Sequence, residues 1–175
     1  MRSAEKKEAT AYILLQFAEW YIETDRKIEE NDLSILKSLK LFFLLSTVNT
    51  DQQGHNLLDI GFNNYIAMPF GPVESSVYDF LKKGEYIDRN SLKYHSLSTY
   101  TFDNINPYKG IIGECIKVLK KINFNLINFS ASQLVDLTHK YSVWINSYNI
   151  AVNNGSSSYE MSAEAIKNEE KFYYL

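Results

Sequence analysis

The chain has little cysteine, little proline and no long apolar run. Its 175 residues include one cysteine, three prolines and seven glycines. A lone cysteine, Cys115, cannot form a disulfide within the chain, so a reducing compartment is expected. The longest strongly apolar run, Leu41 to Leu45, is far too short to cross a bilayer, and no apolar signal segment follows the charged N-terminal residues. These features predict a soluble cytoplasmic protein that does not associate with a membrane.

Concentrated positive charge is lacking as well. The 18 basic residues are scattered among 21 acidic ones, which gives a net charge of −3. Without a basic patch there is no electrostatic footprint for phosphate binding, so we expect no direct nucleic-acid partner. A transcriptional regulator, which would need a basic recognition helix, is disfavoured for the same reason.

Motifs that hold metals, phosphates or nucleophiles are missing too. The histidines His55, His95 and His139 show neither the i, i+4 spacing nor the C-x-x-C spacing of metal ligands. No G-x-S-x-G, G-K-[ST], G-x-G-x-x-G or H-E-x-x-H pattern occurs. We therefore expect no metal, no cofactor and no catalytic residue.

What the chain does have is helical periodicity over most of its length. The apolar spacing and capping residues predict an all-α, mainly helical single domain over residues 1–175, with about five to seven helices. A possible short β-hairpin, or equally an ordered loop, is expected between residues 86 and 103, where apolar residues alternate weakly. Helices are predicted at about 5–24, at 32–48 with Asp32 as N-cap, at 72–83, from 110 to 122, after Ser130, from Trp144 and after Ser162.

The segment from Met68 to Tyr78 contains signals for both a chain reversal and the start of a helix. Gly71 can adopt backbone angles closed to other residues, which suits a chain reversal, and Pro72 suits the first turn of a helix. Glu74 would then lie near the positive end of that helix. Val73 begins an apolar stripe that continues through the predicted helix.

Asp136 and His139 lie three residues apart on one predicted helix, where they could pair. A catalytic role would also need a nucleophile and an oxyanion pocket. We expect instead a structural or partner-facing cluster of these two residues with Thr138 and Trp144. The alternative is a small cytoplasmic hydrolase that uses Asp136 and His139, and it requires both residues to line a concave pocket near a Ser or Thr.

Several segments, in this order, together resemble one family. They are Ala11–Leu14, Leu36–Phe43, Ala67–Val73 with Val77-Tyr78, Leu134–His139 followed by Trp144, and Ile166–Glu170. The set resembles the Panacea domain, the phage-associated, SocA- and GepA-like group of bacterial antitoxins that are encoded beside diverse small toxins. Phe42-Phe43 and Val143 depart from the residues usual in that family.

The resemblance implies a mainly helical binding module without a catalytic group. Such a module neutralises its cognate protein toxin by direct complex formation, or in some members delivers the toxin to a protease complex. The residues that the resemblance and the local patterns single out as partner-binding or family-motif candidates are Phe70, Gly71, Pro72, Val73, Asp136, Thr138, His139 and Trp144.

Overall fold

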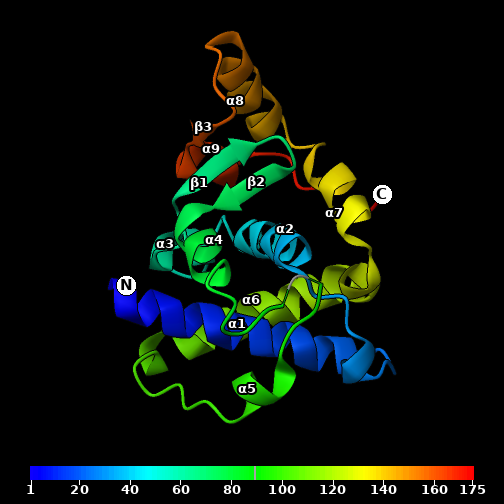
Figure 1. The fold of residues 1–175 in the computed structure, drawn as a ribbon. Coiled ribbons are helices and arrows are strands. Elements are labelled where there is room, and N and C mark those ends of the chain that lie inside the picture. Colours follow the sequence, from blue (N-terminus) through cyan, green and yellow to red (C-terminus); the bar gives the residue numbers. More distant parts are fainter. Residues whose placement is uncertain (89) are drawn as a thin grey trace.

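Helices dominate the structure, a computed structural model that describes residues 1–88 and 90–175 (Figure 1). This confirms the predicted mainly helical fold, although the described residues form nine α-helices rather than five to seven. The helices are α1 (Ser3–Glu23), α2 (Ile35–Ser46), α3 (Leu57–Ile60), α4 (Ser75–Leu81), α5 (Tyr94–Ser98), α6 (Asn106–Ile122), α7 (Ala131–Thr138), α8 (Ser142–Asn153) and α9 (Ala163–Asn168). Short 3₁₀ turns occupy Ile28–Glu30 and Phe124–Asn128. The strands are β1 (Tyr65–Met68), β2 (Gly71–Glu74) and β3 (Tyr159–Met161).

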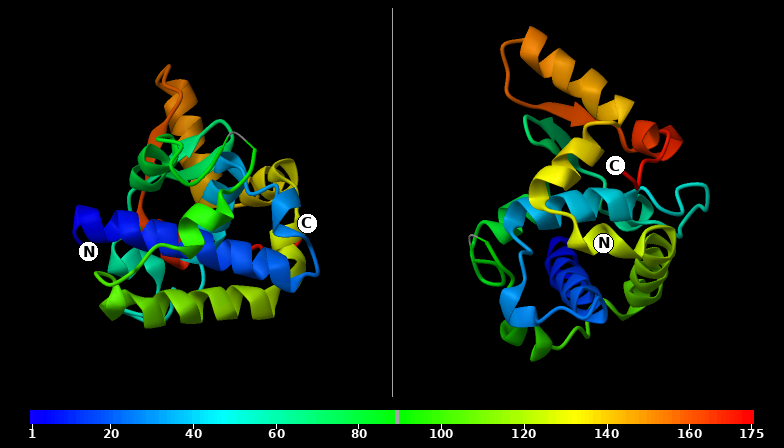
Figure 2. Two further views of the ribbon diagram at one scale, coloured as in Figure 1. Left: turned by 60° about the horizontal axis from the view of Figure 1, so that its bottom comes forward. Right: turned by 90° about the vertical axis from the view of Figure 1, so that its right-hand side faces the viewer.

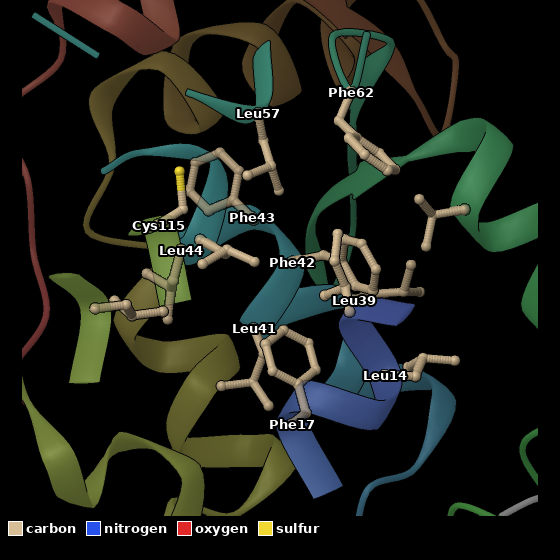
Figure 3. Packing of buried hydrophobic residues seen from close by; sticks show 14 of the residues in the cluster. Leu14, Phe17, Leu39, Leu41, Phe42, Phe43, Leu44, Leu57, Phe62 and Cys115 are labelled. Atoms are coloured by element: carbon tan, nitrogen blue, oxygen red, sulfur yellow. The ribbon is translucent and has the colours of Figure 1, made fainter. Parts of the chain in front are cut away.

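Helix α2 lies at the centre of the core, between α1 and α6 on one side and the strands with α7 on the other (Figure 1). Every residue from Lys37 to Ser46 is buried, because this helix is covered nearly all round. Phe42 packs edge-on against Phe17 of α1, with ring centroids 5.6 Å apart. Phe43 packs edge-on against Tyr141 at 4.9 Å, and Figure 3 shows it beside Leu57 and Cys115.

The three strands form one antiparallel sheet in the order β2-β1-β3. Met68 pairs with Gly71, so Pro69 and Phe70 form the tip of a tight hairpin. The helix predicted over 72–83 therefore begins too early, since Gly71–Glu74 is a strand and α4 starts at Ser75. A proline angle of about −65° fits an extended edge strand as well as a helix, and Pro72 has no N–H to leave unpaired on an edge.

Other parts of the structure refine the sequence-based expectations. The N-cap of α2 is Ser34, whose side chain accepts a hydrogen bond from the Lys37 backbone, while Asp32 accepts one from the Lys37 ammonium instead. Between residues 86 and 103 the described part of the chain contains a single bridge, Ile87 to Leu92, followed by α5. The helix predicted after Ser162 is short, since it ends at Asn168 and the residues that follow are not helical.

Several local predictions are confirmed. Ser130 and Gln133 form the capping box that opens α7, and the Ser162 side chain caps α9. Glu74 caps α4 by accepting a hydrogen bond from the Val77 backbone at 2.9 Å.

Helix α8 extends away from the body of the molecule and packs on β1 and β3 (Figures 1 and 2). The segment after α9 turns back onto the core, where the Tyr173 hydroxyl lies 3.0 Å from Thr47 Oγ1. Asn123 donates to the Tyr173 carbonyl at 2.7 Å. The C-terminal segment thereby connects the C-terminal ends of α2 and α6.

Candidate functional site

The hairpin turn meets the end of α7 directly over α2. Gly71 has a φ of +95°, which strongly favours glycine, and a Cβ at this position would lie 2.7 Å from Thr138 Oγ1 and 3.0 Å from Lys40 Nζ. Both neighbours are themselves buried. Because Gly71 has no side chain, the hairpin, α2 and the end of α7 can contact one another here.

A lysine lies inside this junction. The Lys40 side chain is fully buried, and its Nζ donates a hydrogen bond to the Pro72 carbonyl at 2.8 Å. Burial lowers the pKa of Lys40 to about 7. Lys40 is not among the residues predicted for the site, although a lysine between Leu39 and Leu41 on a helix that is apolar nearly all round was the available signal.

An aromatic stack joins α7 to α8. The His139 ring lies parallel to Trp144, with centroids 3.8 Å apart and an interplanar angle of 8°, and Trp144 in turn stacks on Tyr148 at 5.3 Å. Trp144 Nε1 donates to the Met68 carbonyl at 3.0 Å, which fastens α8 to the hairpin. Burial, and secondarily the charge of Lys40, lowers the pKa of His139, so the ring is neutral near pH 7.

Asp136 and His139 do not form the pair that their spacing allows. Asp136 is exposed, and among the described residues no hydrogen bond or ion pair joins it to His139. Thr138 is buried, and its hydroxyl donates to the Val135 carbonyl of its own helix at 3.0 Å. His139 is the C-cap of α7, so it follows the last helical residue and turns toward Trp144 instead of the exposed helix face.

The start of α8 is capped by a residue from far along the chain. Glu169 accepts hydrogen bonds from the Ser142 hydroxyl at 2.8 Å and from the Val143 backbone N–H at 2.6 Å. An acidic side chain at this end also interacts favourably with the helix dipole. Glu169 thus positions the helix that carries Trp144.

A pocket of about 520 Å³ opens beside the hairpin, between the first half of α2 and α4. Phe70 at the hairpin tip is 67% exposed on its rim, whereas Val73 is buried in its wall. The lining residues are Ser34, Ile35, Leu36, Leu39, Lys40, Met68, Pro69, Phe70, Val73, Tyr78, Lys82 and Asn90. Asp136 and His139 are not among them.

Across residues 1–88 and 90–175, no three His, Cys, Asp or Glu side chains are placed to hold a metal ion. None of the helices in this part of the chain combines the length and the apolar character that a membrane span requires.

The fold and the junction define a small, mainly helical domain organised around a buried lysine, a glycine turn and an aromatic stack. The model of the family described as antitoxin SocA-like, Panacea domain, matches residues 39–145. Because this match spans more than half of the chain, the protein belongs to that family. The matched range contains Lys40, Gly71, Thr138, His139 and Trp144, which all meet at the junction. Neither the curated proteins nor the solved structures yielded a significant match.

Proposed function

We propose that this protein acts in the cytoplasm as an antitoxin that binds a protein toxin encoded beside it and neutralises it by direct complex formation. The observation that carries the proposal is the meeting of the family's motif segments at one junction, with Phe70 exposed beside it. The family makes a toxin partner the expected one. Binding of this kind uses shape and surface chemistry and needs no catalytic group.

The surface that we propose for the toxin runs from the hairpin tip along α8. Ile145 and Val152 on α8 are 39% and 54% exposed, and Tyr148 between them is half-buried. The spacing of i, i+3 and i+7 places the three side chains on one helix face. With Phe70 they supply apolar and aromatic anchors, and a complex of ordinary size would bury roughly 1,600 Å² in total.

A more specific form of this proposal is that the protein neutralises the toxin by delivering it to a protease. It predicts that the toxin level falls when the two proteins are co-expressed, whereas direct neutralisation leaves a stable complex. Following the toxin by immunoblot after translation is stopped separates the two.

A hydrolase using Asp136 and His139 receives less support from the geometry. The two side chains do not contact each other, and the nearby Thr138 hydroxyl is engaged with its own helix. Hydrolysis of an ester or amide panel by the purified protein, lost in the His139→Ala variant, would favour this alternative.

The direct test is to express the neighbouring reading frame alone and together with this chain, and to score growth and co-purification. Growth arrest by the neighbour, rescue by this chain and recovery of a complex are the expected results. Phe70→Ser and Val152→Ser should weaken the rescue, and Phe124→Ser, which changes a 44% exposed side chain outside this surface, is the matched control. A neighbour that is harmless, or toxic but neither rescued nor bound, would contradict the proposal.

A further inference from the structure

The pocket beside the hairpin has an unusual charge for this protein. The whole chain carries a net charge of −3, yet the twelve lining residues include two lysines and neither Asp nor Glu. Most of the others are apolar, among them Leu39 and Val73 in the walls and Phe70 on the rim. An apolar cavity with a cationic group at its rim and no carboxylate in its lining is complementary to a ligand that is apolar at one end and anionic at the other.

The two lysines have different roles in this arrangement. Lys40 is fully buried at the base and is held by the Pro72 carbonyl, so it makes no direct contact with a ligand, and with a pKa of about 7 it is only partly charged at neutral pH. Lys82 is at the end of α4 with its side chain 49% exposed, and its Nζ lies 4.4 Å from the centroid of the Tyr78 ring. Its existing partner is Asp79, one turn earlier and itself exposed. Exposed pairs of this kind contribute little free energy, so Lys82 can exchange Asp79 for an incoming carboxylate at small cost.

The shape of the pocket also fits a peptide more closely than a flat protein surface. Its walls come from the start of α2, the hairpin and α4, which enclose about 520 Å³. That volume falls within the range of small-ligand pockets and accommodates one or two large side chains. A partner would therefore insert a projecting segment here while its remaining surface rests on the hairpin tip and α8.

We propose that this pocket receives a segment of the toxin in which a large apolar side chain is adjacent to an acidic residue. The apolar side chain fills the space between Leu39 and Val73 beneath Phe70, and the carboxylate pairs with Lys82 at the rim. The inference rests on the proposed antitoxin function, because it specifies the chemistry of the partner at the same surface.

Four blocked hexapeptides test the pocket without the toxin. They are identical apart from a central pair, which is Phe-Glu, Phe-Gln, Phe-Lys or Ser-Glu, and each carries the same fluorophore for anisotropy measurements. We expect Phe-Glu to bind best and to exceed Phe-Gln by about fivefold, a ratio that should shrink as salt is added. Equal binding of Phe-Glu and Phe-Lys, or no binding of any of the four at millimolar concentration, would overturn the proposal.

Two variants and one control variant show which residues of the pocket cause the preference. Lys82→Gln should abolish the preference for Phe-Glu over Phe-Gln, whereas Lys83→Gln, which changes an exposed neighbouring lysine that does not line the pocket, should preserve it. Phe70→Ala should weaken the binding of all three phenylalanine peptides and leave that of the Ser-Glu peptide unchanged. Circular dichroism of each variant confirms that it is folded, which is expected because both side chains are substantially exposed.

Co-expression with the neighbouring gene separates this inference from the proposed function. If the wild type rescues growth and Lys82→Gln rescues equally well with unchanged affinity for the toxin, the pocket inference fails and the antitoxin function stands. If the neighbour is not toxic, the antitoxin function fails, and the peptide ratios still decide whether the pocket selects an apolar and acidic segment.

Discussion

The buried lysine under the hairpin should make the stability of this protein depend on pH in a particular direction. In the unfolded chain a lysine has a pKa of about 10.4, while burial lowers that of Lys40 to about 7 in the folded protein. Between these values the unfolded state binds more protons than the folded state, so the free energy of unfolding rises with pH. The Lys40 contribution should be least favourable below about pH 7, where the folded protein must hold a charged amine in its interior.

The size of the effect follows from the two pKa values. Linkage predicts that the free energy of unfolding increases by about 1.6 kcal/mol between pH 7 and pH 8.5. The steepest slope that one titrating group can give is about 1.4 kcal/mol per pH unit. For a protein of this length the predicted increase corresponds to about 3–6 °C in melting temperature. The measurement should stop near pH 8.5, because burial raises the pKa of Cys115 to about 12 and ionisation of this thiol in the unfolded chain opposes the trend above its ordinary value.

Lys40→Met isolates the contribution of this residue, because methionine keeps the apolar length and cannot titrate. Urea unfolding of both proteins at several values between pH 7 and pH 8.5 gives the difference in stability at each pH. We expect the wild type to gain about 1.6 kcal/mol relative to the variant across that interval. A constant difference would refute the reasoning. The hydrogen bond to Pro72 adds an offset, since its loss costs about 1–3 kcal/mol at every pH.

Three further substitutions test the junction. Gly71→Ala should destabilise the protein by about 2–4 kcal/mol in urea unfolding, because it adds a steric clash to an unfavourable φ; Gly155→Ala, at a positive φ in open space, should cost only about 1 kcal/mol. Equal costs would contradict the close approach at Gly71. Glu169→Ala should lower stability by about 1–2 kcal/mol and Glu170→Ala by less than about 0.5, measured in the same way, since only Glu169 caps α8. His139→Ala should weaken stability or toxin binding by about 1–3 kcal/mol without affecting any turnover, measured by unfolding and titration calorimetry. A hydrolytic activity lost in that variant would argue against the binding role.

Local capping and periodicity were sufficient to predict much of the helical framework. Ser130 with Gln133 and the Ser162 cap behave as their spacing indicates, because the hydrogen bonds involved are made within one turn of the chain. Asp32 shows the limit of this reasoning. Its carboxylate is drawn to the buried Lys37 ammonium, and Ser34 takes the capping position instead.

The sheet was not predictable in the same way, since its pairing depends on contacts between distant residues. Pro72 is compatible with both a helix start and an edge strand, and only its position opposite Ala67 decides. Strand β3 has three residues and no alternating pattern of its own, so it is defined by β1 and α8. The weak alternation around Leu92 instead belongs to one bridge and a short helix.

The candidate residues were predicted from local patterns and from a family resemblance, neither of which gives their positions in space. Asp136, Thr138, His139 and Trp144 were expected to form one cluster, whereas the structure stacks His139 on Trp144, places Thr138 beside Gly71 and leaves Asp136 exposed. The Asp136 pairing was not formed, because α7 ends before His139 and the ring turns inward. The position of Lys40 beneath the hairpin results from a contact between distant parts of the chain, and the residue pattern of the helix does not predict that contact.

The Glu169 cap on α8 has a practical consequence for anyone who defines the domain by its family match. A protein trimmed to residues 39–145 would end four residues into α8, with its first turn uncapped and most of its length removed. Strand β1 would lose its β3 neighbour, and α1 would no longer cover the far side of α2. The structure of residues 39–145 thus depends on contacts with the residues before and after them. Expression of this range alone should yield an unstable protein.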